Sequence, residues 1–540
     1  MDHPQHQTMG PDMDKLDKLD QLERSEPLPA LVRAPLAELE SHERHKYNSA
    51  TKLSAIFTVV FSGIALISDG YNAAVIGNIN LLLKERELET FHLNALSDPK
   101  VYPDTYTSIL KTRISNSFFI GEIVGMLLFG ALIDRVGRKF GVVATTCMLI
   151  LGIILSAAAH GTTDFGMFWM LIVGRGLAGV GAGGEYPVCG TSSIEAADET
   201  QHVRKHRGFL IATVGDFAID FGFVLAGIVI LIVLKCYGVT VHSTGTHGFA
   251  GTWRICLALG LVPPLAVFYF RLRMLNSTAY RNNAMKGAAL NVKVFYLAGK
   301  RYWRRMIGTC LCWFLYDFCS YPFGIFSSTI VSQLNPENTI IQNIGWGTLI
   351  NDFLLPGCLI GGVLMDKIGR KKTQALGFFV QGIIGMILGG VLSKIQYHPG
   401  GFIVMYGIFL AAAEAGPGVA TILISGEVYP TALRGHMLGF SAAWGKAGAA
   451  IGTQVFTPIQ NAFSDEFKGQ QAVFLIGSAV SILGAMLTYA CIPDMSETLE
   501  DEDEAWRLYL EENGIDTRSM GEPIEASASG TVVKVIEDRE

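Results

Sequence analysis

Charged residues are scarce in this chain of 540 residues. Asp, Glu, Lys and Arg make up 17% of it, whereas soluble domains carry about a quarter. The basic residues stand in short clusters between apolar runs and form no continuous basic domain, which argues against nucleic-acid binding. The chain also contains no HExxH, P-loop or nucleophile-elbow motif. We therefore expect a protein that is not an enzyme and that carries neither a cofactor nor a metal ion.

Disulfide and secretion signals are missing as well. The spacing of the nine cysteines matches neither a disulfide framework nor a zinc site. Most of them lie in apolar segments, where a thiol serves as a small polarisable core side chain. Residues 1–46 are polar and mixed in charge, so no signal peptide is predicted. The segment from Glu497 onward is acidic, and we interpret both ends as solvated, partly disordered segments.

Long apolar runs dominate the rest of the chain, 50% of which is hydrophobic. A membrane-spanning helix needs about 20 mostly apolar residues. Twelve stretches qualify, at residues 54–83, 115–133, 140–159, 166–190, 208–235, 252–271, 306–330, 345–365, 374–394, 402–425, 436–458 and 472–492. The sequence therefore predicts an all-α membrane protein with twelve transmembrane helices. The 60 glycines, which follow no collagen-like period, agree with helices packed closely in a membrane.

The distribution of Lys and Arg predicts the orientation of these helices. Basic clusters stand at residues 135–139, 204–207, 271–305 and 367–372, and all of them fall on one side if both termini are cytoplasmic. The predicted domains are then a cytoplasmic N-terminal tail, a six-helix bundle, a cytoplasmic central loop, a second six-helix bundle and an acidic cytoplasmic tail, over residues 1–50, 51–271, 272–305, 306–492 and 493–540.

The two predicted bundles repeat each other in sequence. GALIDRVGRK (130–139) recurs as GVLMDKIGRK (362–371), and EYP (185–187) is echoed by EVYP (427–430). Internal duplication is typical of transporters built from two related bundles around a central site. The acids of the repeated motif can pair with arginines and cap neighbouring helix ends, so we expect a gate at the cytoplasmic side formed by Asp134, Arg138, Asp366 and Arg370.

The repeated motif resembles the signature of the major facilitator superfamily, over essentially the whole membrane region. GRGLAGVGAG (174–183) is similar to the fourth-helix signature of its proton-coupled members. GGEYP, CWFLYDFCSYP (312–322), SAAWGKAG (441–448) and SGEVYPTALRG (425–435) resemble the phosphate:proton symporter branch. Within that branch, SDGYN (68–72) and AHGTTDFGMFWML (159–171) are similar to the fungal glycerophosphodiester permeases, which include glycerophosphoinositol permeases.

The resemblance implies a binding site for an anionic phosphodiester. Trp313, Asp317 and Tyr321 follow one another at helical spacing and so share one face of a helix. Together with Tyr186, they match the phosphate-binding residues of the branch. Lys446, a lone lysine in an apolar span, is the expected partner of the anion. Gly418 stands where phosphate symporters carry an asparagine, and the missing side chain suggests space for a bulkier diester. Aromatic packing is the alternative reading for the Trp and Tyr residues.

Four ionisable residues in the predicted spans are candidates for proton coupling, because charges inside a bilayer are costly and are usually functional. These residues are Asp69, Arg175, Glu185 and Asp317. We expect Asp317 to pair with Lys446 when the site is empty and to take up a proton as the anion arrives. Glu185 could lie at the cavity between a cation and a proton, or merely neutralise Arg175, and Asp69 could instead form a structural hydrogen bond.

Three further acids are candidates for contacts with the organic group of the cargo. Asp216 and Asp220 stand four residues apart on one predicted helix, where repulsion favours retention of a proton by one of them, and Glu414 lies in another span. They could contact polyol hydroxyls or, for Glu414, a choline group, and a structural role remains the alternative.

The sequence as a whole predicts a monomeric proton symporter in the plasma membrane that imports glycerophosphodiesters by alternating access, with the proton gradient as its energy source. An inorganic phosphate symporter and a nutrient sensor that keeps the fold but does not transport are the alternatives.

Overall fold

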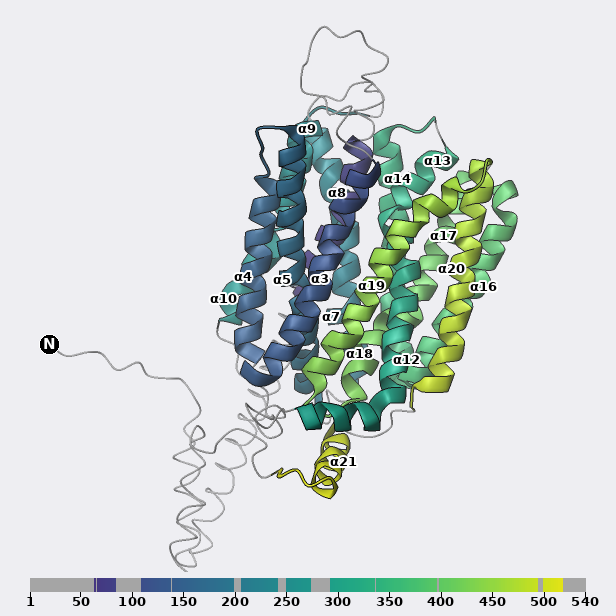
Figure 1. The fold of residues 1–540 in the computed structure, drawn as a ribbon. Helices are drawn as coiled ribbons and strands as arrows, with labels where there is room; N and C mark the ends of the chain where they lie inside the picture. The colour runs from purple at the N-terminus through teal and green to yellow at the C-terminus, as the bar shows by residue number, and fades with distance from the viewer. Residues whose placement is uncertain are drawn as a thin grey trace, which may run out of the picture. The chain divides into compact units, whose positions relative to one another are not determined.

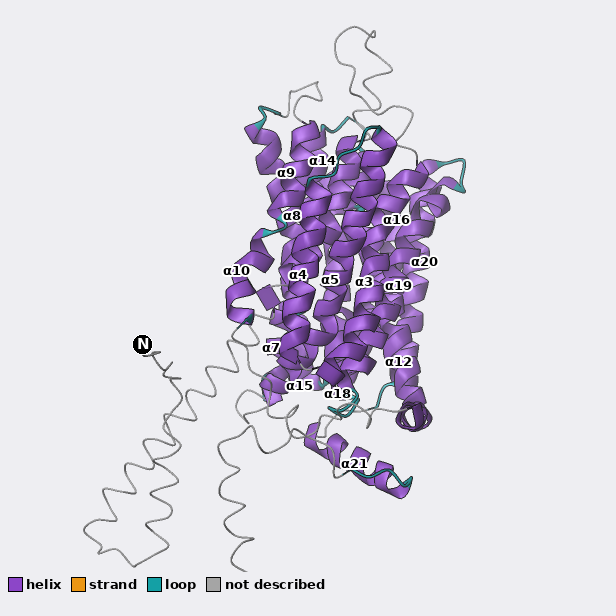
Figure 2. Cartoon of the chain, turned by 60° about the vertical axis from the view of Figure 1, so that its left-hand side comes forward, coloured by secondary structure: helices purple, strands orange, loops and turns teal. Residues whose placement is uncertain are grey.

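The computed structural model describes residues 63–64, 66–83, 108–136, 138–198, 205–240, 249–272, 292–335, 337–395, 398–493 and 499–517. These residues are almost entirely helical, and no strand occurs among them (Figure 2). Nine helices of this described part are long and apolar enough to cross a membrane. The predicted all-α membrane fold is therefore confirmed. The N-terminal tail, residues 1–50, lies outside the described residues.

In the first half, α3 (Ser108–Val136) and α4 (Arg138–Ala157) pack along the long helix α5 (Asp164–Asp198) (Figure 1). The other helices of this half are the helix over residues 63–64 and 66–83, α7 (Arg207–Val214), α8 (Asp216–Cys236), α9 (Phe249–Leu259) and α10 (Val262–Arg271). Gly215 separates α7 from α8, and two consecutive prolines follow the start of α10 at Val262. Breaks at glycine or proline are expected, because these residues disrupt the helical hydrogen-bond ladder.

The second half contains α12 (Val292–Ile325), α13 (Ser327–Leu334), α14 (Ile340–Asp352), α15 (Leu354–Ile368), α16 (Arg370–Ile395), α17 (Pro399–Ala413), η2 (Glu414–Gly418), α18 (Val419–Glu427), α19 (Arg434–Asn461) and α20 (Glu466–Cys491). α12 begins inside the segment predicted as a central loop, because Lys and Arg are good helix formers and extend the helix beyond its apolar part. The segment η2 is a turn of π-helix around Gly416-Pro417-Gly418, and such turns often occur at functional sites.

Close helix contacts join the two halves. α3 and α19 lie side by side (Figures 1 and 2). A Cβ added at Gly439 of α19 would overlap the carbonyl oxygen of Met126 in α3. Nearer the other end of α3, Thr453 donates to Asn116 Oδ1 at 3.0 Å. Small residues thus allow the backbones to approach, as is usual between membrane helices.

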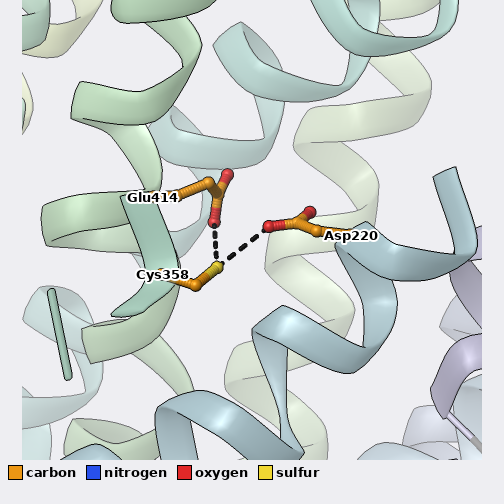
Figure 3. Close-up of side chains that lie close together, drawn as sticks. All are labelled: Asp220, Cys358 and Glu414. Carbon is orange, nitrogen blue, oxygen red and sulfur yellow. Dashed lines mark hydrogen bonds between the residues drawn. The ribbon is translucent and has the colours of Figure 1, made fainter. Parts of the chain in front are cut away.

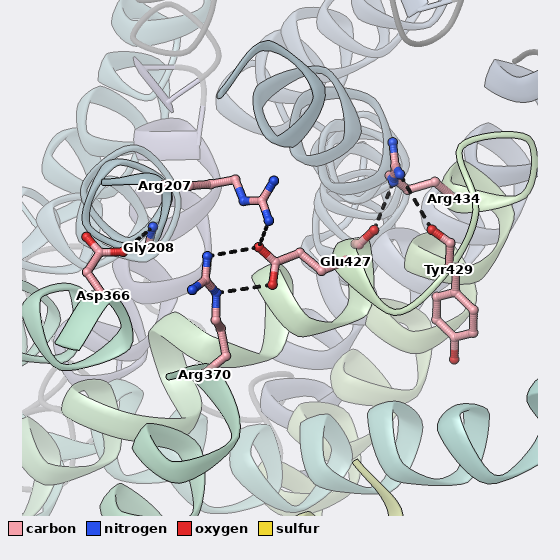
Figure 4. Close-up of polar contacts among 8 residues, drawn as sticks. Arg207, Gly208, Asp366, Arg370, Glu427, Tyr429 and Arg434 are labelled. Carbon is pink, nitrogen blue, oxygen red and sulfur yellow. Dashed lines mark hydrogen bonds and ion pairs between the residues drawn. The ribbon is translucent and has the colours of Figure 1, made fainter. Parts of the chain in front are cut away.

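Polar contacts hold the two halves together at the end of the bundle that carries the repeated motif (Figure 4). Glu427 of α18 forms ion pairs with Arg207 Nη2 at 2.7 Å and with Arg370 Nε at 3.1 Å. Asp366 of α15 accepts hydrogen bonds from the backbone N–H groups of Gly208, at 2.8 Å, and Phe209, at 3.0 Å. Asp366 therefore caps the first turn of α7. Arg370 and Asp366, both predicted gate residues, lie in this cluster.

The first copy of the motif is less fully described. The side chains of Asp134 and Arg138 lie outside the described residues, so their predicted part in the gate stays a prediction. Glu427 and Arg207 belong to this ion-pair cluster, and the motif did not indicate them. Glu427 stands in EVYP, the echo of EYP, which could have drawn attention to it.

A further helix, α21 (Leu499–Glu512), packs on this end of the second half. Its Glu502 accepts hydrogen bonds from Tyr302 at 2.7 Å and from Arg305 at 2.8 Å, and its Trp506 is fully buried. The expectation of a solvated tail from Glu497 onward is therefore wrong for α21. Trp506 and Leu510, four residues apart, give the acidic helix one apolar face that can pack. Residues 518–540 lie outside the described part.

Replacing Glu427 by glutamine should destabilise the protein. Glu427 is 1% exposed, and its loss leaves the charges of Arg207 and Arg370 facing each other in a buried setting. Breaking such a buried pair costs about 3–5 kcal/mol. We expect the apparent melting temperature in detergent to fall by several degrees, while Asp352→Asn, at an exposed position on α14, leaves it unchanged. Equal melting temperatures for both variants would contradict the proposed weight of this ion-pair cluster.

Candidate functional site

A small cavity lies between the two halves near the middle of the bundle. Its volume is about 30 Å³, which leaves room for little more than a water molecule. The lining residues come from both halves and are Tyr186, Asp216, Ile219, Asp220, Phe223, Trp313, Tyr316, Asp317, Ser320, Tyr321, Gly324, Leu354, Glu414 and Ile422. A larger ligand can enter only if helices or side chains move apart.

Lys446 of α19 stands beside this cavity and is 1% exposed. Its ammonium nitrogen forms ion pairs with Glu122 Oε1 at 3.5 Å and with Asp69 Oδ2 at 3.8 Å. It also donates a hydrogen bond to the Tyr321 hydroxyl and lies 4.9 Å from the centre of the Tyr186 ring. A buried ammonium group needs such partners, because it has lost its hydration.

The structure corrects the predicted partner of Lys446. No ion pair joins Lys446 to Asp317 among the described residues, and both carboxylate oxygens of Asp317 are without a hydrogen-bond donor there. The prediction relied on helix positions alone, which could not show that the 63–83 helix and α3 bring two other acids nearer. Asp317 itself lines the cavity, as expected.

Glu122 is a site residue that the sequence reasoning missed. Glu122 is fully buried in α3, and its carboxylate lies closer to the Lys446 nitrogen than the carboxylate of Asp69 does. A signal was present, since Glu122 is an acid in the apolar stretch FFIGEIVGMLLFG. Intramembrane acids of this kind are functional candidates by default.

The predicted aromatic residues converge on the cavity. Tyr186, Trp313 and Tyr321 all line it, and the ring centres of Tyr186 and Trp313 lie 6.2 Å apart. The hydroxyl of Tyr186 donates to Asp69 Oδ2 at 2.6 Å. Trp313, Asp317 and Tyr321 therefore share the inner face of α12, as their spacing predicted. Hydroxyl and indole groups on that face can donate hydrogen bonds to an anion.

Arg175 and Glu185 lie apart from the cavity lining. Arg175 donates to the carbonyl oxygens of Ile114, at 3.0 Å, and Asn72, at 3.2 Å. Glu185 accepts hydrogen bonds from Thr145, at 2.9 Å, and Thr146, at 3.3 Å, both on α4. The two residues stand ten positions apart on the continuous helix α5, or about 15 Å along its axis. Glu185 therefore cannot neutralise Arg175, which corrects one of its two expected roles.

The three predicted organic-group acids gather at one wall of the cavity. Glu414 Oε1 accepts a hydrogen bond from the Tyr316 hydroxyl at 2.5 Å, and the Cys358 thiol lies 3.0 Å from Asp220 Oδ2 and 3.9 Å from Glu414 Oε2 (Figure 3). Asp216 lines the same cavity. The ligand atoms of Asp220, Cys358 and Glu414 lie within 4.8 Å of one another, so this trio has a spacing that could hold a metal ion.

Gly418 does not open the expected free space. A Cβ at this position would overlap Glu414 Oε2 and come within 2.9 Å of the Tyr316 hydroxyl. The carboxylate of Glu414, one turn earlier in η2, thus occupies the room that the missing side chain leaves. The π-helical turn brings the two residues together, and no sequence pattern indicates that arrangement.

Comparisons with known proteins agree on one family. The model of the sugar (and other) transporter family matches residues 55–289 and 281–506. The chain is 37% identical to glycerophosphoinositol permease 1 of Candida albicans, over 87% of this chain and 85% of the relative. It is 35% identical to glycerophosphoinositol transporter 1 of Saccharomyces cerevisiae, over 90% of each chain. Low affinity inorganic phosphate transporter 3 of Petunia hybrida is 28% identical over 82% of this chain and 88% of its own.

The same fold occurs in solved structures. The proton:xylose symporter XylE superposes with a TM-score of 0.66 at 18% identity, over 85% of this chain and all of that one. Its similarity therefore concerns the helical architecture and carries nothing about cargo.

A double-mutant cycle should identify the partner of Lys446. We expect the stability loss of Lys446→Met to be partly restored by Glu122→Gln, because the second change removes the acid that the first leaves unpaired. A coupling energy of about 1–3 kcal/mol is expected for this contacting pair. The matched cycle with Asp317→Asn should show less coupling, and thermal unfolding in detergent measures both. Stronger coupling to Asp317 would overturn the assignment.

Proposed function

Because the chain belongs to the sugar (and other) transporter family of the major facilitator superfamily, we propose that it is a proton-coupled symporter that imports glycerophosphodiesters by alternating access. The cargo is a small anion such as glycerophosphoinositol, and the energy source is the proton gradient without a bound cofactor. The protein acts as a monomer in the plasma membrane with both termini in the cytoplasm. One observation supports the proposal most: a buried lysine shared by two acids beside a cavity rich in hydrogen-bond donors.

The donors around Lys446 fit a phosphodiester. Such a group is an anion whose oxygens only accept hydrogen bonds. The ammonium group supplies the opposite charge, and Trp313, Tyr321 and Tyr186 supply an indole N–H and two hydroxyls at the cavity wall. Charge-assisted hydrogen bonds of this kind are strong in a site that excludes water.

Coupling to protons follows from the competition for Lys446. In the described state its charge is balanced by Asp69 and Glu122. An arriving anion draws the ammonium group toward itself, and the two acids, left buried without that cation, favour protonation. Asp317 faces the cavity without a hydrogen-bond donor, so it too favours the protonated form when an anion lies beside it. Cargo and proton therefore stabilise each other's binding.

Transport also requires the closed centre to open alternately to the two sides. The cavity of about 30 Å³ is far smaller than any glycerophosphodiester. The cluster of Glu427, Arg207 and Arg370 closes one end, and the contact between Asn116 and Thr453 joins the halves towards the other. Rocking of one half against the other would break these contacts in turn.

Inorganic phosphate is the alternative cargo. The similarity to a plant phosphate transporter favours it, and the Lys446 ammonium group of this chain could bind phosphate as well as a diester. The wall of acids at Asp220 and Glu414 disfavours it, because phosphate offers no hydroxyl-rich or apolar group to meet that wall.

Uptake into proteoliposomes tests the cargo directly. With an imposed proton gradient, we expect labelled glycerophosphoinositol to accumulate, and excess unlabelled glycerophosphoinositol to compete more strongly than phosphate. Accumulation should vanish when the gradient is collapsed with a protonophore. Stronger competition by phosphate would favour the alternative cargo, and binding without any uptake would favour a sensor.

Replacing Asp317 by asparagine should separate coupling from binding. The amide keeps the size of the side chain but takes up no proton. We expect accumulation driven by the gradient to be lost, while exchange of labelled for unlabelled cargo across the membrane persists. The matched control is Asp352→Asn, the same substitution at an exposed position, which should leave both activities unchanged. Full accumulation by Asp317→Asn would exclude this residue from proton coupling.

The variant Glu185→Gln tests a predicted coupling residue that lies away from the cavity. Its carboxylate accepts hydrogen bonds from Thr145 and Thr146, and a glutamine oxygen can accept them as well. We therefore expect uptake by Glu185→Gln to keep its dependence on the proton gradient. Uptake independent of the gradient would return Glu185 to the coupling machinery.

A further inference from the structure

An acidic wall forms part of the cavity lining, beside the anion-binding residues. It consists of Asp216, Asp220, Ser320 and Glu414, with Tyr316 and Cys358 bonded to its acids. No ion pair with Lys or Arg is found for Asp216, Asp220 or Glu414 within the described part of the chain. Carboxylates in such a setting need hydrogen-bond donors, because burial without partners is costly.

Several polar atoms at the cavity, on this wall and on Asp317 beside it, have no hydrogen-bond partner among the described residues. Ser320 is 8% exposed, and its hydroxyl makes no hydrogen bond to the described residues. Asp216 Oδ2 and both oxygens of Asp317, which is 1% exposed, are in the same condition. All three residues line the cavity. Buried polar groups are nearly always paired, so this group of unpaired atoms indicates a ligand that brings hydrogen-bond donors.

Gly418 leaves the space that the Glu414 carboxylate of this wall occupies. A side chain there would displace the Glu414 carboxylate, since even a Cβ overlaps Oε2 and crowds the Tyr316 hydroxyl. The glycine therefore lets an acceptor, the Glu414 carboxylate, occupy the space that a side chain at position 418 would take. An acid at this place repels a free phosphate but binds hydroxyl groups.

We infer that the acidic wall is a second subsite, which binds a hydroxyl-rich organic group while Lys446 holds the phosphodiester, and that Gly418 determines this specificity through Glu414. The inference rests on the proposed function. A polyol such as inositol offers several O–H donors to the unpaired acceptors. A quaternary ammonium group offers charge but no donor, so it would leave Ser320 and the acid oxygens unsatisfied.

The test compares two diesters that differ only in the organic group, glycerophosphoinositol and glycerophosphocholine. Gly418→Ala moves the end of a flexible side chain rather than backbone atoms, so the variant is expected to fold. We expect its Kd for glycerophosphoinositol to rise about tenfold and that for glycerophosphocholine by less than about twofold. Gly390→Ala, at an exposed helical glycine with open space around it, is the matched control and should change neither.

Ser320→Ala provides an independent variant, because it removes an unpaired hydroxyl without adding bulk. It should weaken glycerophosphoinositol binding selectively as well. Isothermal titration of the purified protein in detergent measures binding, and proteoliposome uptake is measured in parallel. Equal weakening for both diesters, no weakening by either variant, or a selective loss of glycerophosphocholine would overturn the subsite. If the wild-type protein binds glycerophosphoinositol selectively but accumulates neither diester, the proposed function is wrong and the subsite is still supported.

Discussion

The packing of the centre of this protein depends on the balance of charge around the Lys446 ammonium group. Lys446 is 1% exposed, so the bundle must supply its counter-charges, and it does so with Asp69 from the 63–83 helix and Glu122 from α3. Because Lys446 belongs to α19, these ion pairs also join the two halves. In the proposed mechanism, an anion competes for the lysine and weakens these ion pairs, which links binding to the movement of the two halves.

The polar cluster at Glu427 resembles that centre in its physical construction. Both use a buried charge shared between helices of different halves, and both would be costly to leave half-formed. α21 supports the cluster from the second half, because its Glu502 binds Arg305, which also donates to the carbonyl oxygen of Val428 beside Glu427. In the described state, the ion pairs of Lys446 and those of Glu427 are formed together.

The proposed division of the cavity into a donor group and an acidic wall offers one way for this fold to bind related cargoes. In the proposed mechanism, positive charge and hydrogen-bond donors for a phosphate group come from Lys446, Tyr186, Trp313 and Tyr321. The acidic wall of Asp216, Asp220, Ser320 and Glu414 provides acceptors, and the position of the Glu414 carboxylate depends on Gly418. A change at one glycine can thus alter the chemistry of the acidic wall without touching the donor group.

The sequence by itself determined the all-α membrane fold, the duplicated motif and the shared face of Trp313, Asp317 and Tyr321, because these follow from hydropathy, repetition and helical period. Only the tertiary structure decided that Lys446 pairs with Glu122 and Asp69 rather than Asp317, and that Glu414 fills the space beside Gly418. Those outcomes depend on how helices distant in sequence rotate and approach one another, and on a π-helical turn, and a periodic pattern along one chain carries no record of either.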